Sequence, residues 1–234
     1  MNYAIIAAGE GSRLRNEGVT APKPLVPLCG QPMIGRLIDI FVRCGAESVS
    51  VIVNEQMTEV AEFIRNLSKK LTIPLKLVVK TTPSSMHSFY EVSRAASGGK
   101  FILTTVDTIF REDDFRHYAE AFDADDNDDG MMALTSFIDD EKPLYVDVDQ
   151  NMEITAFRDE PFDGVRFISG GIYGLKDNAL EVLSQCIESG VSRMRNFQRA
   201  LVSSGLCLRA FDFGKIIDVD HQSDIAKAEE FINQ

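Results

Sequence analysis

The chain has 234 residues, of which 44% are hydrophobic and 26% are charged. These proportions are normal for a globular protein with a full core, and the length suits one large α/β domain better than two complete ones. The formal net charge is −12 and no block of basic residues occurs, so duplex nucleic acid and anionic membranes are not expected as partners.

The first half of the chain alternates predicted strands with predicted helices. Runs of β-branched and aliphatic residues predict strands at 3–8, 48–53, 75–80 and 101–105. Apolar residues at helical spacing predict helices at 32–44, 57–70 and 88–96. This alternation favours a parallel sheet with helices on both sides. Ligands bind to such sheets beyond the carboxyl ends of the strands.

The second half of the chain has a different pattern, because several predicted strands follow one another directly. They lie at 131–137, 145–148, 153–157 and 165–175. Helices are predicted at 178–187, 191–203 and 223–232, the last capped by Ser223, and strands at 206–213 and 216–219. Consecutive strands predict antiparallel additions to the parallel sheet.

A glycine-rich loop follows the first predicted strand. It carries Gly9, Gly11, Ser12 and Arg13, and Lys23 follows ten residues later between two prolines. Glycines let backbone N–H groups approach phosphate oxygens, since no Cβ stands in the way. The two cations can neutralise the phosphate charge. The loop therefore predicts a site for a triphosphate.

Two common phosphate loops do not fit this sequence. The dinucleotide fingerprint needs a third glycine where Leu14 stands, and the P-loop pattern G-x-x-x-x-G-K-[ST] does not occur. The string G-E-G-S-R-L followed by A-P-K-P-L instead resembles the signature of the sugar-phosphate and phosphocholine nucleotidyltransferase superfamily. The resemblance implies a Rossmann-like α/β fold: a mostly parallel mixed sheet flanked by helices, GT-A-like, with a small antiparallel acceptor-side subregion. It also implies a single domain, 1–234, with a nucleotide-binding half at 1–122 and an acceptor-binding half at 123–234.

Carboxylates at two distant places suggest a metal site. Asp107 follows a predicted strand, and Asp218 and Asp220 form a D-x-D pair before the last predicted helix. In the superfamily, metal ligands occupy these two places, so the resemblance implies Mg²⁺ on Asp107 and on Asp218 or Asp220. Alternate residues of an extended segment point in opposite directions, so one of the pair is expected to ligate, and which one stays open. Residues 125–130 fit half of an EF-hand loop, but position twelve would be Ser136, and a solvated acidic turn is expected instead.

The resemblance also implies which residues contact the nucleotide and the acceptor. The expected nucleotide-binding residues are Ala7, Ala8, Gly9, Gly11, Ser12 and Ser85. Many sugar-nucleotide members have E-K-P after a strand, with its lysine on the acceptor phosphate; residues 158–161 read R-D-E-P, so Arg158 is the candidate substitute. Gly171 lies in S-G-G-I-Y, which resembles the N-A-G-I-Y strand of the acceptor pocket. The three arginines within 193–199 are expected to form a solvated basic face.

The implied reaction joins a nucleoside triphosphate (NTP) to a phosphorylated acceptor and releases pyrophosphate, as in sugar nucleotide biosynthesis. Lys23 is expected to contact the α-phosphate or the acceptor phosphate, and Arg13 the departing pyrophosphate, which makes these two cations the candidate catalytic residues. Two alternatives stay open. One is a GT-A-like glycosyltransferase that consumes a nucleotide sugar, and the other is a non-catalytic nucleotide-binding regulatory module.

The expected compartment is the cytoplasm. The four cysteines are widely spaced without a C-x-x-C pair, which argues against zinc and dithiol sites and suits a reducing environment. The N-terminus lacks the pattern of a signal peptide, and no apolar run approaches the roughly 20 residues that span a bilayer. The sequence leaves open the base, the acceptor (a sugar 1-phosphate or a phosphocholine-like molecule) and the oligomeric state.

Overall fold

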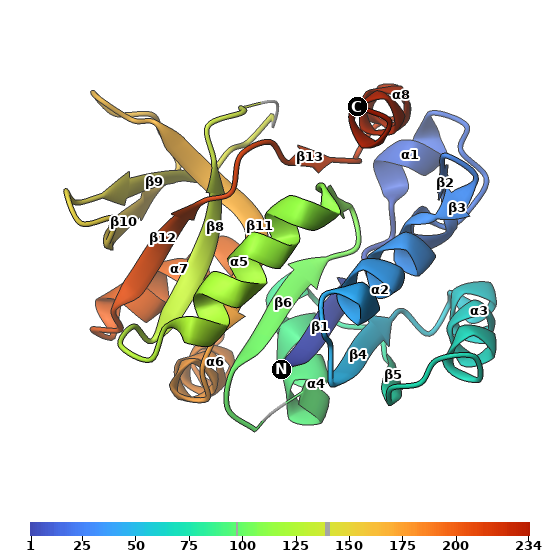
Figure 1. Cartoon of the computed structure of the whole chain (residues 1–234), viewed down its shortest axis with the longest axis horizontal. Helices are drawn as coiled ribbons and strands as arrows, with labels where there is room; N and C mark the ends of the chain where they lie inside the picture. Colours follow the sequence, from blue (N-terminus) through green and yellow to red (C-terminus); the bar gives the residue numbers. More distant parts are fainter. Residues whose placement is uncertain (97, 139–140) are drawn as a thin grey trace.

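A nine-stranded mixed sheet runs through the centre of the molecule (Figure 1). The computed structural model describes residues 1–96, 98–138 and 141–234. Strands pair in the order β10-β9-β11-β6-β1-β4-β5, and β8 pairs with both β11 and β12. The fold predicted from the sequence, a mostly parallel mixed sheet between helices with an antiparallel subregion, is confirmed.

The parallel part of the sheet comes from the first half of the chain. Strand β1 pairs in parallel with β4 and β6, and β4 pairs in parallel with β5. Their bounds are β1 (Asn2–Ala7), β4 (Ser48–Val53), β5 (Leu75–Val79) and β6 (Phe101–Thr105). Along β1, Ile5 packs into the core on one face of the sheet and Ile6 into the core on the other. Burial on both faces explains why these strands read as unbroken apolar runs.

Helices cover the two faces of the sheet (Figure 1). The first core is closed by α2 (Met33–Arg43), α3 (Thr58–Ser68), α5 (Glu112–Ala124) and α8 (Gln222–Ile232). The second core is closed by α4 (Ser85–Ala96), α6 (Asn178–Glu188) and α7 (Met194–Ser203). Within the described ranges, none of the helices has the length and apolarity needed to cross a bilayer.

The second half of the chain supplies the antiparallel part. The strand β11 (Phe167–Leu175) runs antiparallel to β6, β8 and β9, and β9 pairs antiparallel with β10. The remaining bounds are β8 (Gly130–Thr135), β9 (Tyr145–Val148), β10 (Ile154–Arg158) and β12 (Leu208–Asp212). Strand β12 is parallel to β8, so the C-terminal segment crosses back over the sheet toward the first loop.

Four helix predictions need correction, and one of them concerns α7, which begins at Met194 rather than at residue 191. Helix α5 was not predicted, although its acidic first turn suits a helix N-terminus and Phe115 and Phe122 are buried. Helix α4 begins at Ser85 rather than at residue 88. Ser223 does not cap α8: His221 is the N-cap, and it forms a capping box with Asp224.

Short elements bring the two ends of the chain together at the carboxyl edge of the parallel strands. Strand β13 (Ile217–Asp218) pairs with β7 (Thr108–Ile109), directly after β6. The backbone N–H of Val219 donates to the carbonyl of Asp107 at 3.0 Å. The first loop contains α1 (Ser12–Asn16), η1 (Lys23–Leu25), β2 (Pro27–Leu28) and β3 (Gln31–Pro32). The loop and the D-x-D segment therefore face one another across this edge.

Candidate active site

The glycine-rich loop holds Lys23 in a defined position. Gly11 is in the left-handed conformation at φ +61° and forms the N-cap of α1. A Cβ on Gly11 would lie 2.8 Å from the Cβ of Lys23, so only glycine lets the lysine stem pass this close. Lys23 itself begins a 3₁₀ turn after Pro22, whose carbonyl accepts from the N–H of Leu25. The loop thus fixes the start of the lysine side chain by backbone geometry.

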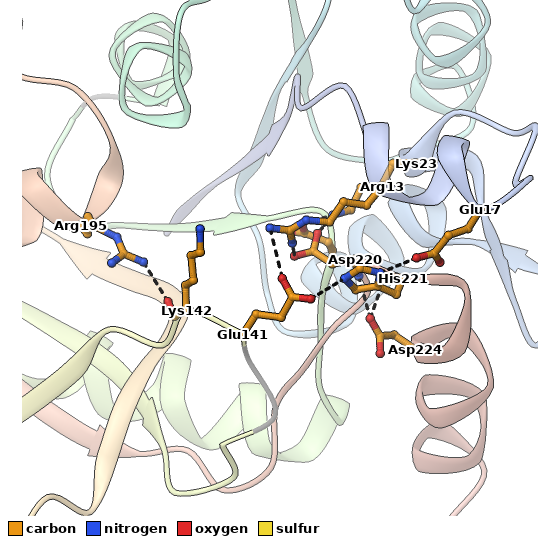
Figure 2. A network of polar contacts seen from close by, with 10 residues as sticks. Arg13, Glu17, Lys23, Glu141, Lys142, Arg195, Asp220, His221 and Asp224 are labelled. Carbon is orange, nitrogen blue, oxygen red and sulfur yellow. Dashed lines mark hydrogen bonds and ion pairs between the residues drawn. The ribbon is translucent and has the colours of Figure 1, made fainter. Parts of the chain in front are cut away.

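Two cations and two carboxylates meet at this edge of the sheet. The Nζ of Lys23 lies 2.5 Å from Oδ2 of Asp107 and 2.6 Å from Oδ1 of Asp220. The guanidinium of Arg13 lies 2.7 Å from the other carboxylate oxygen of Asp220, as Figure 2 shows. The sequence-based prediction that these residues lie together therefore agrees with the geometry, although the ligand and the roles stay predictions.

The contact between Lys23 and Asp107 favours the charged form of each group. Burial by itself would lower the pKa of Lys23, but the carboxylates of Asp107 and Asp220 outweigh it and raise that pKa. Burial would raise the pKa of Asp107, but the ammonium of Lys23 outweighs it and lowers that pKa. The lysine side chain is only 9% exposed, whereas those of Arg13 and Asp220 are 47% and 38% exposed. Solvent therefore weakens the Arg13–Asp220 pair more than the contacts of Lys23.

A second layer of contacts holds Asp220 in place. The carboxylate of Asp224 accepts hydrogen bonds from the backbone N–H groups of Asp220 (3.2 Å) and His221 (2.8 Å). The His221 ring lies 2.6 Å from Glu17 and 3.3 Å from Glu141 (Figure 2). The hydrogen bond to Glu17 raises the pKa of His221. These contacts link the first loop to the start of α8.

A cavity of about 520 Å³ opens beside the charged cluster. Of the residues predicted to bind a nucleotide, its walls include Ala8, Gly9, Gly11, Ser12 and Ser85. Ala7 lies in β1, is 1% exposed and packs into the core, so its side chain does not reach this space. Asn54 also lines the cavity and was not predicted. It directly follows β4 at the carboxyl edge of the sheet, so the same rule that identified Asp107 could have found it.

A smaller cavity of about 290 Å³ adjoins the first one and shares Ser85, Thr105, Asp107 and Asp220 with it. Gly171, predicted to contact the acceptor, lines this second cavity at φ +76°. A Cβ there would lie 3.0 Å from the hydroxyl oxygen of a threonine in β7. Asp218 lines the second cavity only, whereas Asp220 lines both cavities.

The structure places the predicted acceptor arginine elsewhere. Arg158 ends β10, where its guanidinium lies 3.0 Å from Asp147 and 5.1 Å from the centre of the Phe162 ring. Among the described residues that line the second cavity, the arginines are instead Arg193 and Arg195. The expectation of a solvated basic face is therefore wrong for Arg195, which is half-buried and paired with Asp159, whereas Arg193 is exposed.

Asp159 explains how the arginines of α7 are held. Its carboxylate lies 2.5 Å from the guanidinium of Arg195 and 2.7 Å from that of Arg199. The backbone carbonyl of Lys142 accepts a further bond from Arg195 at 2.9 Å (Figure 2). The R-D-E-P segment thus supplies the anchor for a cavity arginine rather than the cation itself.

The acidic turn before β8 has structural contacts. Asp129 accepts hydrogen bonds from the side chain of Asn178 and the backbone N–H of Cys207, and Asp128 pairs with Arg209. Across residues 1–96, 98–138 and 141–234, no three or more carboxylate, histidine or cysteine side chains gather closely enough to hold a metal ion by themselves.

Comparisons with known proteins identify the family and the fold of the chain. The model of the MobA-like NTP transferase domain family matches residues 3–159. The Bifunctional protein GlmU of Thermodesulfovibrio yellowstonii is 23% identical over 99% of this chain and 52% of its own length. Among the curated relatives compared, the matched part is between 15% and 55% of the relative, so the chain spans about half their length or less.

Solved structures share the fold over nearly the whole chain. A putative glucose-1-phosphate thymidylyltransferase from Bacillus anthracis has a TM-score of 0.84 at 19% identity, covering 98% of this chain and 94% of that one. The inositol-1-phosphate CTP transferase from T. maritima has a TM-score of 0.81 at 18% identity, covering 99% and 97%. Because the family model covers more than half of the chain, this protein belongs to the MobA-like NTP transferase domain family of nucleotidyltransferases.

Proposed function

We propose that this chain catalyses Mg²⁺-dependent transfer of a nucleotidyl group from an NTP to a phosphorylated acceptor, with release of pyrophosphate. The observation that carries the proposal is the convergence of Arg13, Lys23, Asp107 and Asp220 on one cavity of about 520 Å³. A triphosphate needs cations along its length, and Arg13 and Lys23 supply two beside this cavity in a chain with a net charge of −12.

The donor set fits a divalent metal. Asp107 and Asp220 each direct a carboxylate oxygen to the same lysine nitrogen, so these two oxygens converge on one small space. Mg²⁺ in phosphoryl-transfer sites takes one or two carboxylates and completes its shell with phosphate oxygens and water. Bound there, it would withdraw electron density from the α-phosphate and offset its growing negative charge. Asp220 is the better candidate of the D-x-D pair, because it shares Lys23 with Asp107.

The protein needs to supply no nucleophile for this reaction. An oxygen of the acceptor phosphate attacks the α-phosphorus, the bond between the α-phosphorus and the bridging oxygen breaks, and pyrophosphate leaves with the electron pair. The acceptor phosphate is already anionic, so no base has to remove a proton first. Lys23 would donate to the α-phosphate or the acceptor phosphate, and Arg13 would hold the departing pyrophosphate.

The acceptor side favours a hydroxylated phosphate. The second cavity is lined by cations, by hydroxyl groups, by the amide of Gln198 and by three carboxylates, and Tyr173 is the single aromatic residue among its described lining residues. A quaternary ammonium is bound best by several aromatic faces, which these lining residues do not supply. A sugar or polyol phosphate could bond its phosphate to the arginines and its hydroxyl groups to polar groups such as Ser169. The lining of the second cavity therefore supports a sugar-phosphate-like acceptor over a phosphocholine-like one.

The two cavities also support a division of labour within one domain of residues 1–234. Apart from Asp220, the first cavity is lined by residues of the 1–122 half, whereas most of the walls of the second come from the 123–234 half. We assign the nucleotide to the first half and the acceptor to the second.

The four cysteines are all unpaired, which supports placing the protein in the reducing cytoplasm.

A screen for pyrophosphate release tests the proposed function. CTP, UTP, GTP and dTTP are each combined with sugar 1-phosphates, a polyol phosphate and phosphocholine in the presence of Mg²⁺. We expect one NTP to release pyrophosphate only when a hydroxylated phosphate is present. Nucleotide binding without any turnover would instead indicate a regulatory module, and consumption of a nucleotide sugar with transfer to a hydroxyl acceptor would indicate a glycosyltransferase.

A further inference from the structure

The ammonium of Lys23 engages both carboxylates that the proposed function assigns to the metal. It lies 2.5 Å from Asp107 and 2.6 Å from Asp220, and Arg13 takes the remaining oxygen of Asp220 at 2.7 Å. These four groups carry two positive and two negative charges, and the carboxylate of Glu141 lies 3.8 Å from the guanidinium of Arg13. The lysine is 8% exposed, so its charge depends on these carboxylates rather than on water.

A metal ion bonded to the same two oxygens would need the same space. Metal–oxygen distances for Mg²⁺ are about 2.0–2.1 Å, so the ion would have to lie within the gap that the lysine nitrogen bridges. The stem of Lys23 is packed against Gly11 and its backbone is held in the 3₁₀ turn. The end of the side chain can turn, but it can leave the carboxylates only if another anion receives it.

A triphosphate is such an anion. Without it, a divalent ion would add two positive charges next to Lys23 and Arg13, and the lysine would lose its partners. With it, both cations gain phosphate oxygens, and the same phosphates supply further ligands to the metal. Resting on the proposed function, we propose that Lys23 and the divalent metal exchange at Asp107 and Asp220, so that the metal enters the site only together with the NTP.

Metal binding without turnover tests this exchange. Mn²⁺ is a suitable probe because it shares the preference of Mg²⁺ for oxygen ligands and is detected by electron paramagnetic resonance. The nucleotide-free wild-type protein is compared with Lys23→Met, and with Lys80→Met, which removes an exposed lysine paired with Glu91 outside both cavities. We expect Lys23→Met to bind Mn²⁺ at least about tenfold more tightly than the other two proteins, because the competing charge is gone. Adding Asp107→Asn to Lys23→Met should abolish that gain.

Thermal unfolding gives a second readout, also for a variant of low stability. A ligand that binds the folded state raises its melting temperature, so Mn²⁺ alone should stabilise Lys23→Met or Lys23→Gln and leave the wild type unchanged. Equal Mn²⁺ affinity in wild type and Lys23→Met, or a gain that survives Asp107→Asn, would overturn the exchange. Neither result would contradict the proposed transfer activity, which the pyrophosphate screen tests separately.

Discussion

Replacing Gly11 with alanine should disable the site while leaving the fold largely intact. Gly11 has φ +61°, and a Cβ added there would meet the Cβ of Lys23 at 2.8 Å. That atom lies at the base of the lysine side chain, on backbone that turns between two prolines. It cannot swing aside as the end of a flexible side chain could, so the lysine stem must shift.

Gly18 offers a matched control in the same loop. It has φ +94°, but no heavy atom lies within 4 Å of an added Cβ. Both alanine variants should lose about 1–2 kcal/mol because the left-handed conformation disfavours a side chain. For a domain of this size, each kcal/mol lowers the melting temperature by about 2–4 °C. Only Gly11→Ala also displaces the lysine ammonium, and a misplacement of about 1 Å reduces the rate by about 100-fold.

The assay is steady-state pyrophosphate release with the NTP and acceptor found by the screen, alongside thermal denaturation. We expect Gly11→Ala to melt at a lower temperature than Gly18→Ala, because the clash with Lys23 must also be relieved, and to lose about 100-fold in activity while Gly18→Ala keeps it. If Gly11→Ala were as active as Gly18→Ala, the close approach of Gly11 to Lys23 would have no part in setting the site.

Three further predictions concern the acceptor cavity, the histidine contact and the core. Arg195→Met should raise the KM for the acceptor about tenfold or more, because one charge-assisted hydrogen bond is lost, whereas Arg158→Met should leave the KM unchanged. Equal effects of the two substitutions would indicate that Arg158 also contacts the acceptor. Glu17→Gln should move the pKa of His221, followed by NMR, down toward its ordinary value of 6.5. Because the Glu17 contact raises the pKa of His221, its stabilising effect is fully present below pH 6.5 and is lost as the pH rises through the pKa of His221 in the folded state. The difference in the free energy of unfolding between Glu17→Gln and the wild type should therefore shrink from pH 6 to pH 9. Tyr118→Phe should lower the free energy of unfolding in urea by about 1–3 kcal/mol, because its buried hydroxyl donates to a carbonyl of β8 and accepts from an N–H of β11; an unchanged midpoint would refute this.

Much of the fold could be predicted because its strands are buried on both faces. Strand β4 has the bounds expected from its unbroken run of apolar residues, and it is buried throughout. Helix α5 was not predicted, although its acidic first turn, Glu112 to Asp114, is typical of a helix start and its buried residues Phe115, Tyr118, Ala119 and Phe122 have helical spacing. The pairing of β13 with β7 could not be predicted from local pattern, because each strand has two residues and each depends on the other half of the chain.

The nucleotide side of the candidate site could be predicted from the sequence, whereas the acceptor side could not. The residues of the nucleotide side lie in one continuous loop or directly after a buried strand. The glycine-rich motif and the position of Asp107 at the carboxyl edge of the sheet therefore predicted that Arg13, Lys23 and Asp107 lie close together. The acceptor side depends on where an edge hairpin and α7 come to lie. Arg158 therefore faces Asp147 on that hairpin, while Arg195, assigned to a solvated face, reaches the cavity.

Pyrophosphate release by Lys23→Ala tests most directly whether these four charged residues act on one triphosphate. Lys80→Ala, which removes an exposed lysine outside both cavities, is the control. We expect Lys23→Ala to lower kcat by at least about 100-fold, the loss typical of a missing transition-state donor, with Lys80→Ala unchanged. A rate near that of the wild type in Lys23→Ala would contradict the proposed site.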